Sequence, residues 1–181
     1  MTSYCYFYAM FRCIEYTAFL WKAKGRHGTH SPFAFWLADQ VVGQKPVIKQ
    51  QLFTSITCVR TRNFLNKLST AIPHFQVLIT DESERQLSVM RGGQEPCIYI
   101  QSSVQLKQLV DQINFETLHP DSIFVIYEPR RRKHKSNWQA LIENQQFHFT
   151  ADCFYFGLLS PKPGQAKQHF HLKLGGGTNN L

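Results

Sequence analysis

The stretch DSIFVIYEPRRRKHK, residues 121–135, decides the fold class of this chain. Residues 123–127 within it form a run of β-branched and aromatic side chains between polar neighbours. Such a run is typical of a strand buried on both faces of a parallel sheet. Pro129 cannot continue a strand ladder, so we expect the strand to end near Glu128. Because open α/β sheets bind ligands beyond the carboxyl ends of their strands, the residues that follow are candidates for a site.

The densest positive charge in the chain comes directly after this strand. Arginine can bind a phosphate through two parallel hydrogen bonds, and such contacts give affinity without reading a base sequence. The sequence therefore predicts an anion-binding or nucleic-acid-binding set in this loop. Its members are Arg130, Arg131, Arg132, Lys133 and Lys135. The alternative is a solvated loop that only keeps the protein soluble.

Composition favours one folded domain with a basic surface. The 181 residues are 43% hydrophobic, and the formal net charge is +8 with a pI of about 9.4. This charge favours RNA or another polyanion as a partner. The five cysteines are scattered without a CxxC pair, which indicates a reduced, cytoplasmic protein with buried thiols and argues against zinc.

The N-terminal residues 4–24 predict an amphipathic helix, with a repeated apolar face that we expect to pack on the core. The face comprises Phe7, Met10, Phe11, Ile14, Ala18 and Trp21. Contact of this helix with a membrane surface is the weaker alternative. Arg12 and Glu15 interrupt the segment before it reaches the ~18 apolar residues of a membrane span, so no transmembrane segment is expected.

Two further helices are expected before the sheet begins. Ser31 is a candidate N-cap for a helix over residues 32–42, with Pro32 at its first position. Residues 47–71 predict a helix in their second part, where Phe64, Leu65 and Leu68 form an apolar face. We therefore expect residues 1–72 to form a helical segment that packs on the sheet.

From residue 75 onward, short strands alternate with helices. The predicted strands are residues 75–79, 97–100, 123–127, 152–159 and 168–174, and the predicted helices are residues 81–90, 104–118 and 137–143. A short Pro/Gly loop joins the last two strands, which favours an antiparallel pair. The sequence thus predicts an α/β core over residues 73–174, with a parallel sheet, an antiparallel C-terminal edge and a disordered tail at 175–181.

Motifs at both ends of the chain resemble a known family. Residues 24–33 read KGRHGTHSPF, and residues 167–173 read KQHFHLK. Between them lie the segment of residues 121–129, Trp138, and FYFGLL at 154–159. Over roughly two thirds of the chain, the order and spacing of these elements resemble a bacterial group of small class I S-adenosylmethionine-dependent methyltransferase-like proteins. The resemblance marks a motif turn made of Arg26, His27, Gly28, His30 and Ser31.

This resemblance implies a Rossmann-like sheet with a reversed last strand. The family has a glycine-rich loop after its first strand, which lets the backbone approach the cofactor. Here the corresponding residues 79–84, ITDESE, contain no glycine. Their carboxylates would repel the carboxylate of S-adenosylmethionine. About two strands of the family pattern are also missing, and the pair of acidic residues that the family has after the strand at 123–127 is reduced to the single Glu128. We therefore expect a reduced fold that binds no cofactor.

Histidines are candidates for metal ligands or acid–base groups. His27 and His30 lie three residues apart, and His169 and His171 alternate along one predicted strand. A metal site would need further ligands that the sequence does not place nearby, so no metal is expected. For the first pair, hydrogen bonds that hold the turn are the favoured interpretation.

These observations lead to one main hypothesis and two alternatives. The main hypothesis is a degenerate methyltransferase-fold protein that binds RNA, another polyanion or a partner protein without catalysis. The first alternative is an active methyltransferase with an atypical S-adenosylmethionine pocket, in which Glu128 would be the base or substrate-orienting group. The second is a peripheral membrane protein held by the N-terminal helix.

Overall fold

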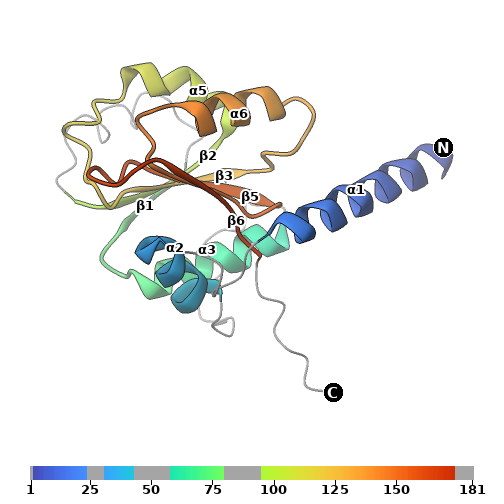
Figure 1. Ribbon diagram of the computed structural model, residues 1–181, viewed down its shortest axis with the longest axis horizontal. Helices are drawn as coiled ribbons and strands as arrows, with labels where there is room; N and C mark the ends of the chain where they lie inside the picture. Colours follow the sequence, from blue (N-terminus) through green and yellow to red (C-terminus); the bar gives the residue numbers. More distant parts are fainter. Residues whose placement is uncertain (1, 24–30, 43–57, 80–94, 174–181) are drawn as a thin grey trace.

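A six-stranded sheet lies between two layers of helices in the computed structural model of the chain (Figure 1). The structure describes residues 2–23, 31–42, 58–79 and 95–173. The strands are β1 (Gln76–Ile79), β2 (Cys97–Ser102), β3 (Ile123–Tyr127), β4 (Phe149–Asp152), β5 (Phe156–Ser160) and β6 (Gln168–His171). Their order across the sheet is β1-β2-β3-β5-β4-β6.

One strand of the sheet, β5, runs opposite to the other five. The pairs β1·β2, β2·β3 and β4·β6 are parallel, whereas β5 pairs antiparallel with both β3 and β4. Strand β3 is buried along nearly its whole length, as its apolar run predicts. The prediction of an α/β fold with a largely parallel sheet is confirmed.

The predicted antiparallel C-terminal edge is wrong in its position. The reversed strand β5 lies inside the sheet, while the edge strand β6 is parallel to its neighbour β4. Residues 152–159 do not form one strand, because the chain turns at Phe154, where φ is +67°. This tight turn returns β5 alongside β4 and separates β5 from β6.

Each face of the sheet has its own helices and its own apolar core (Figure 1). One face is covered by α2 (Pro32–Trp36), the π-helical turn η2 (Leu37–Val42) and α3 (Val59–Ala71). The other is covered by α5 (Ser103–Leu109), the 3₁₀ turn η3 (Val110–Gln112) and α6 (Lys135–Glu143). The predicted face of α3 is confirmed, since Phe64, Leu65 and Leu68 are all buried.

Helix ends follow the capping signals in the sequence. The Ser31 side chain accepts a hydrogen bond from the Ala34 backbone N–H, which confirms it as the N-cap of α2. Ser102 and Gln105 form a capping box at the start of α5. The helix predicted over residues 104–118 is shorter than expected, because the 3₁₀ turn η3 tightens it and a turn over residues 114–118 follows.

Helix α1 (Thr2–Lys22) is present as predicted, but its expected core face is wrong. The large apolar side chains Met10, Phe11, Ile14 and Trp21 are all exposed. Among the α1 side chains whose burial the structure describes, residues 10–22, the buried one is Phe19. The helix touches the rest of the molecule through the opposite face, near its C-terminal end, and its N-terminal end projects away from the sheet (Figure 1).

Several predicted features lie outside the described residues. They are the motif turn at Arg26, His27, Gly28 and His30, residues 80–90 with the predicted helix and most of the cofactor-loop equivalent, and the tail at 175–181. Among the residues that the structure does describe, no helix combines the length and apolar character needed to cross a membrane.

Candidate functional site

The carboxyl ends of β2, β3, β4 and β6 meet at one edge of the sheet, because these strands run in the same direction. Ser102, Glu128, Asp152 and His171 therefore lie along this carboxyl edge. Ligands of open α/β sheets bind at such an edge, so it is the candidate functional site. The loop over residues 128–135, called the basic loop below, leaves the sheet here.

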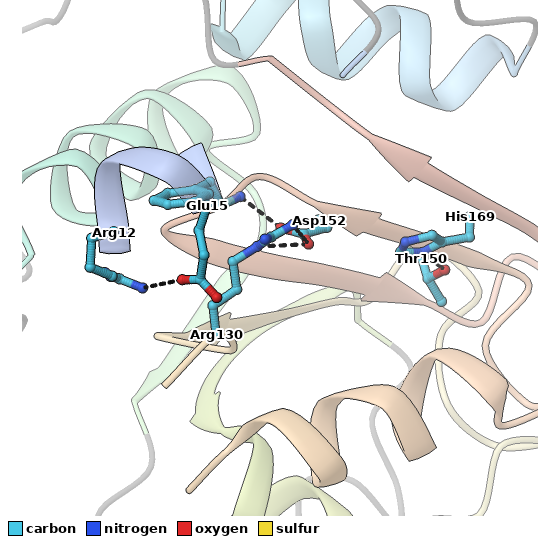
Figure 2. Close-up of polar contacts among 7 residues, drawn as sticks. Arg12, Glu15, Arg130, Thr150, Asp152 and His169 are labelled. Carbon is cyan, nitrogen blue, oxygen red and sulfur yellow. Dashed lines mark hydrogen bonds and ion pairs between the residues drawn. The ribbon is translucent and has the colours of Figure 1, made fainter. Parts of the chain in front are cut away.

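Arg130 is engaged in an ion pair within the protein. Its Nη2 donates to Asp152 Oδ2 at 2.6 Å, and its Nε donates to the same oxygen at 3.1 Å. The other oxygen of Asp152 accepts the Phe154 backbone N–H at 2.7 Å. Figure 2 shows the Arg130 side chain reaching Asp152. Because Asp152 is almost fully buried, its charge needs this partner, and Arg130 is a structural residue of the edge.

Aromatic rings complete the surroundings of Arg130. Its guanidinium lies 5.0 Å from the Phe19 ring centre and 5.1 Å from that of Phe154. The Phe154 ring also meets Tyr16 edge-on at 4.8 Å. Cation–π contacts of this kind gain strength when the cation is desolvated. Helix α1 is thus docked across the carboxyl ends of β3 and β4, at the place where a ligand of an open sheet would sit.

A second arginine contributes to the docking of α1. The Arg60 guanidinium lies 4.5 Å from the Tyr155 ring centre and 5.7 Å from that of Tyr16, and its Nη1 donates to the Tyr155 hydroxyl at 2.7 Å. On α1 itself, Arg12 lies 4.0 Å from Glu15 and 5.3 Å from the Phe154 ring centre, and Figure 2 shows the first contact. The docking face of α1 is therefore made of aromatic rings and paired charges.

Glu128, the candidate base, has a structural role in the turn after β3. Its φ is +49°, and its backbone N–H donates to Tyr155 O at 3.2 Å. Its carboxylate accepts from Arg131 Nε at 2.9 Å, while its backbone oxygen lies 3.1 Å from Nδ1 of buried His134. The left-handed backbone and these contacts fix the shape of the basic loop. A general base at Glu128 would first have to give up its ion pair.

Three basic side chains of this loop remain exposed and have no ionic partner among the described residues. They are Arg132, Lys133 and Lys135. The predicted anion-binding set thus divides into two internally paired arginines, Arg130 and Arg131, and three exposed cations. Arg131 keeps about half of its side chain exposed, at 49%, so it can still reach an outside anion.

The two histidines of β6 lie on one face of the strand, as their alternation predicts. Their ring centres are 5.0 Å apart, and His169 Nδ1 lies 2.8 Å from Thr150 Oγ1 (Figure 2). Loss of hydration and the neighbouring His171 lower the pKa of His169 to about 4, and burial also lowers the pKa of His171. Within the described ranges no three His, Cys, Asp or Glu side chains lie close enough to hold a metal ion.

Two buried polar side chains on β2 have no hydrogen-bond partner. The Gln101 residue is fully buried, and neither its Oε1 nor its Nε2 is paired. The buried hydroxyl of Tyr99 also lacks a partner of good geometry, although the Cys97 thiol is close enough to interact with it, and burial raises the pKa of this hydroxyl far above its usual value. Both side chains belong to the face of the sheet covered by α5 and α6, since they lie two positions apart along the strand with only Ile100 between them. Unpaired buried groups are costly and often mark a site with a role.

The sequence missed the principal partner at this edge, Asp152. It is an acidic residue at the end of a buried strand, which is the same signal that identified Glu128. The signal is hidden because the strand predicted over residues 152–159 begins at Asp152, whereas in the structure Asp152 is the last residue of β4. Phe19 and Phe154 could not be found from periodicity, because each acts through contacts between distant segments.

Comparison of the chain with family models, with curated proteins and with solved structures found no match in any of the three searches. The residues of the carboxyl edge are thus the basis on which function can be argued.

Proposed function

We propose that the chain is a non-catalytic binding module on a reduced methyltransferase-like fold, whose basic loop contacts the phosphate backbone of RNA. The observation that carries this proposal is the division of charge in the loop. Asp152 and Glu128 pair with Arg130 and Arg131, while Arg132, Lys133 and Lys135 remain exposed on a turn of fixed shape.

A fixed loop favours binding, because fewer conformations are lost when it contacts a partner. Buried His134 anchors the loop at its far end, and its backbone oxygen accepts from the Ser103 hydroxyl at 3.1 Å. The exposed cations project from this frame beside the carboxyl edge. Contacts from such side chains to phosphates give affinity without base reading, which agrees with the net charge of +8.

Two features support the absence of catalysis. The only carboxylate that the sequence offered as a base, Glu128, is bound to Arg131. Helix α1 also occupies part of the carboxyl edge, where Phe19 and Tyr16 contact Phe154. The single reversed strand among parallel ones supports kinship with a methyltransferase-like sheet. The paired Glu128 and the covered edge favour a protein without catalytic activity, and the reversed strand favours its methyltransferase-like origin.

The test compares two variants that remove the same charge. Arg132→Gln/Lys133→Gln removes two exposed cations of the basic loop, and Lys107→Gln/Lys173→Gln removes two cations elsewhere. With a single-stranded RNA of mixed sequence, we expect the loop variant to bind on the order of tenfold more weakly at about 100 mM salt. Its plot of log affinity against log salt should be shallower by about 1.4, since each lost phosphate contact removes ~0.7.

The control variant should keep the wild-type slope to within a few tenths, because it leaves the loop intact. Equal losses in both variants would mean that only the net charge matters, and an unchanged slope in the loop variant would remove the basic loop from the interface.

One observation favours a second function, the binding of a small cofactor for methyl transfer. The unpaired amide of buried Gln101 lies on β2 one residue before the carboxyl edge, and an amide can both donate to and accept from a ligand. If S-adenosylmethionine binds in an atypical pocket, calorimetry with it or its demethylated product should give micromolar affinity. That affinity should fall at least tenfold in Gln101→Leu. Absence of heat at millimolar ligand would support the non-catalytic proposal.

A further inference from the structure

Over residues 10–22, helix α1 presents large apolar side chains to solvent. Trp21 is 95% exposed, Phe11 63%, Ile14 58% and Met10 55%. Isolated apolar residues are common on protein surfaces, but these four belong to one helix. Bulky side chains gathered in this way mark a surface that a partner covers.

The exposed residues form a regular stripe. Met10, Ile14, Thr17 and Trp21 follow one another at steps of four, three and four residues, which places them along one side of a helix. The hydroxyl of Thr17 donates to the Ile14 backbone oxygen at 2.9 Å, so its donor keeps a hydrogen-bond partner when a second helix excludes water from the seam. We call these four residues the α1 seam. The same spacing repeats at the a and d positions of paired helices.

The seam lies opposite the face that docks on the protein. Tyr16 and Phe19 contact Phe154, and they are offset from Ile14 and Trp21 by about half a turn of the helix. The N-terminal end of α1 also projects clear of the sheet (Figure 1). A second helix can therefore lie along the seam without displacing any contact that holds α1 to the carboxyl edge.

We propose that the α1 seam binds the α1 seam of a second copy of this chain. A symmetric pair of this kind is the commonest form of oligomer, because the same patch serves both partners. The contact would bury each Trp21 and Ile14 against apolar neighbours from the other copy. This inference concerns a surface separate from the basic loop, so it stands or falls independently of RNA binding.

Charge favours a second copy over a membrane surface. The seam itself carries no charge, so no like charges face each other where two seams meet, and only the net charge of +8 on each chain opposes their association. Helices that lie on membranes use Lys and Arg on their polar face to reach anionic lipids. On α1 the cation Arg12 is committed to Glu15 and to the Phe154 ring, which leaves Lys22. The helix therefore has the exposed apolar face of a membrane-binding helix but lacks the basic face that would contact anionic lipids.

The available area suits a weak dimer. With large side chains of roughly 150–250 Å² each, the exposed parts of the seam residues Met10, Ile14 and Trp21 and of Phe11, which flanks the seam, sum to about 400–700 Å² per copy. A symmetric pair would hide about twice this area, near the 1,000–1,200 Å² at the lower end of specific interfaces. We therefore expect a dissociation constant of about 1–50 µM.

The test is sedimentation equilibrium of the full chain from about 1 to 200 µM. The wild type should change from one chain mass, 21.1 kDa, toward twice that mass. Ile14→Glu should remain monomeric, because a charge in the seam faces apolar groups of the other copy. The matched control is Val59→Glu, since Val59 is also 55% exposed but lies on α3, and it should dimerise like the wild type.

Tryptophan fluorescence reports the same event at the seam. Trp21 is almost fully exposed, whereas Trp138 is buried and Trp36 is half-buried. Dimerisation should shift the emission to shorter wavelength as concentration rises, and Trp21→Gln should abolish both the shift and the dimer. This second variant also serves if Ile14→Glu does not fold.

Three results would overturn the proposal. The wild type could stay at one chain mass up to 200 µM, or both Ile14→Glu and Trp21→Gln could dimerise like the wild type, or Val59→Glu could lose the dimer equally. Flotation with vesicles of phosphatidylcholine and phosphatidylserine distinguishes a second copy of the chain from a membrane as the partner of the seam. A monomeric wild type that floats, while Ile14→Glu does not, would assign the seam to a membrane in place of a second copy.

Discussion

Arg130 and Arg131 are adjacent in the sequence but differ in their energetic role. Arg130 donates two hydrogen bonds to buried Asp152, whose side chain is only 6% exposed. Arg131 pairs with Glu128 at the surface, where its own side chain is 49% exposed. Water screens the second pair and scarcely reaches the first, so loss of a partner should be costly only at Arg130.

This difference predicts the effect of Asp152→Asn. The substitution keeps the size of the side chain but leaves the Arg130 guanidinium without its counter-charge. We expect the free energy of unfolding to fall by about 2–3 kcal/mol, since Arg130 itself is partly exposed. Urea denaturation at pH 7 measures this change. The control Arg131→Gln should cost no more than about 1 kcal/mol, and equal costs in both variants would contradict the assignment.

The histidines of β6 predict a dependence of stability on pH. The pKa of His169 is lowered to about 4 in the folded protein, below the usual 6.5, because partial loss of hydration and then the neighbouring His171 oppose its protonation, although the side chain stays in part exposed. Between these values the unfolded chain binds more protons than the folded chain, so stability falls as pH drops from about 6.5 to 4. Because His169 is exposed at the sheet edge, solvent limits the size of this effect.

The measurement is the urea midpoint of the wild type and of His169→Gln from pH 7.5 to pH 4.5. The urea midpoint of the variant should fall less than that of the wild type as the pH drops. The lowered pKa of His171 accounts for part of the fall that the variant still shows. Parallel curves for the two proteins would exclude His169 as a source of the dependence.

At the scale of elements, β5 and α6 approach each other closely through a glycine. A Cβ added at Gly157 would lie 2.6 Å from Cζ3 and 2.7 Å from Cζ2 of Trp138. The Trp138 ring is buried and cannot move without disturbing the core. The glycine is thus required for contact between the reversed strand and its covering helix, and no special backbone angle is involved.

Gly157→Ala should therefore lower the free energy of unfolding by about 1–3 kcal/mol through overpacking. Thermal unfolding of this variant, of Trp138→Phe and of the double variant measures the coupling. We expect the double variant to be less damaged than the sum of the single ones, because the smaller ring makes room for the methyl group. Strict additivity would show that the two residues do not compete for the same space.

At the scale of the whole molecule, two surfaces respond oppositely to salt. The α1 seam is uncharged, while each copy of the chain carries a formal net charge of +8. Salt screens repulsion between two copies over a Debye length of about 10 Å at 0.1 M. The same screening weakens contacts of the basic loop with phosphates.

Raising NaCl from about 50 to 300 mM should therefore strengthen dimerisation two- to tenfold, while RNA binding weakens. Sedimentation and RNA titration of one protein preparation over this salt range provide the comparison. A dimer that weakens with salt would indicate that charged groups outside the seam hold it together.

The sequence alone determined the elements that depend on neighbouring residues. The apolar run at 123–127 predicted β3, the spacing of Phe64, Leu65 and Leu68 predicted the buried face of α3, and Ser31 predicted the start of α2. Such signals can be found without a structure, because strand burial, helix periodicity and capping act over a few residues.

Only the tertiary structure decided which charges are free and which face of α1 is covered. Arg130 and Asp152 are 22 residues apart and meet because β3 and β4 end at the same edge of the sheet. The apolar periodicity of α1 identified a helix but gave its buried face wrongly, since Phe19 and Tyr16 find aromatic partners at Phe154. A local pattern shows that an apolar stripe exists, whereas the surface that covers it depends on how distant segments pack.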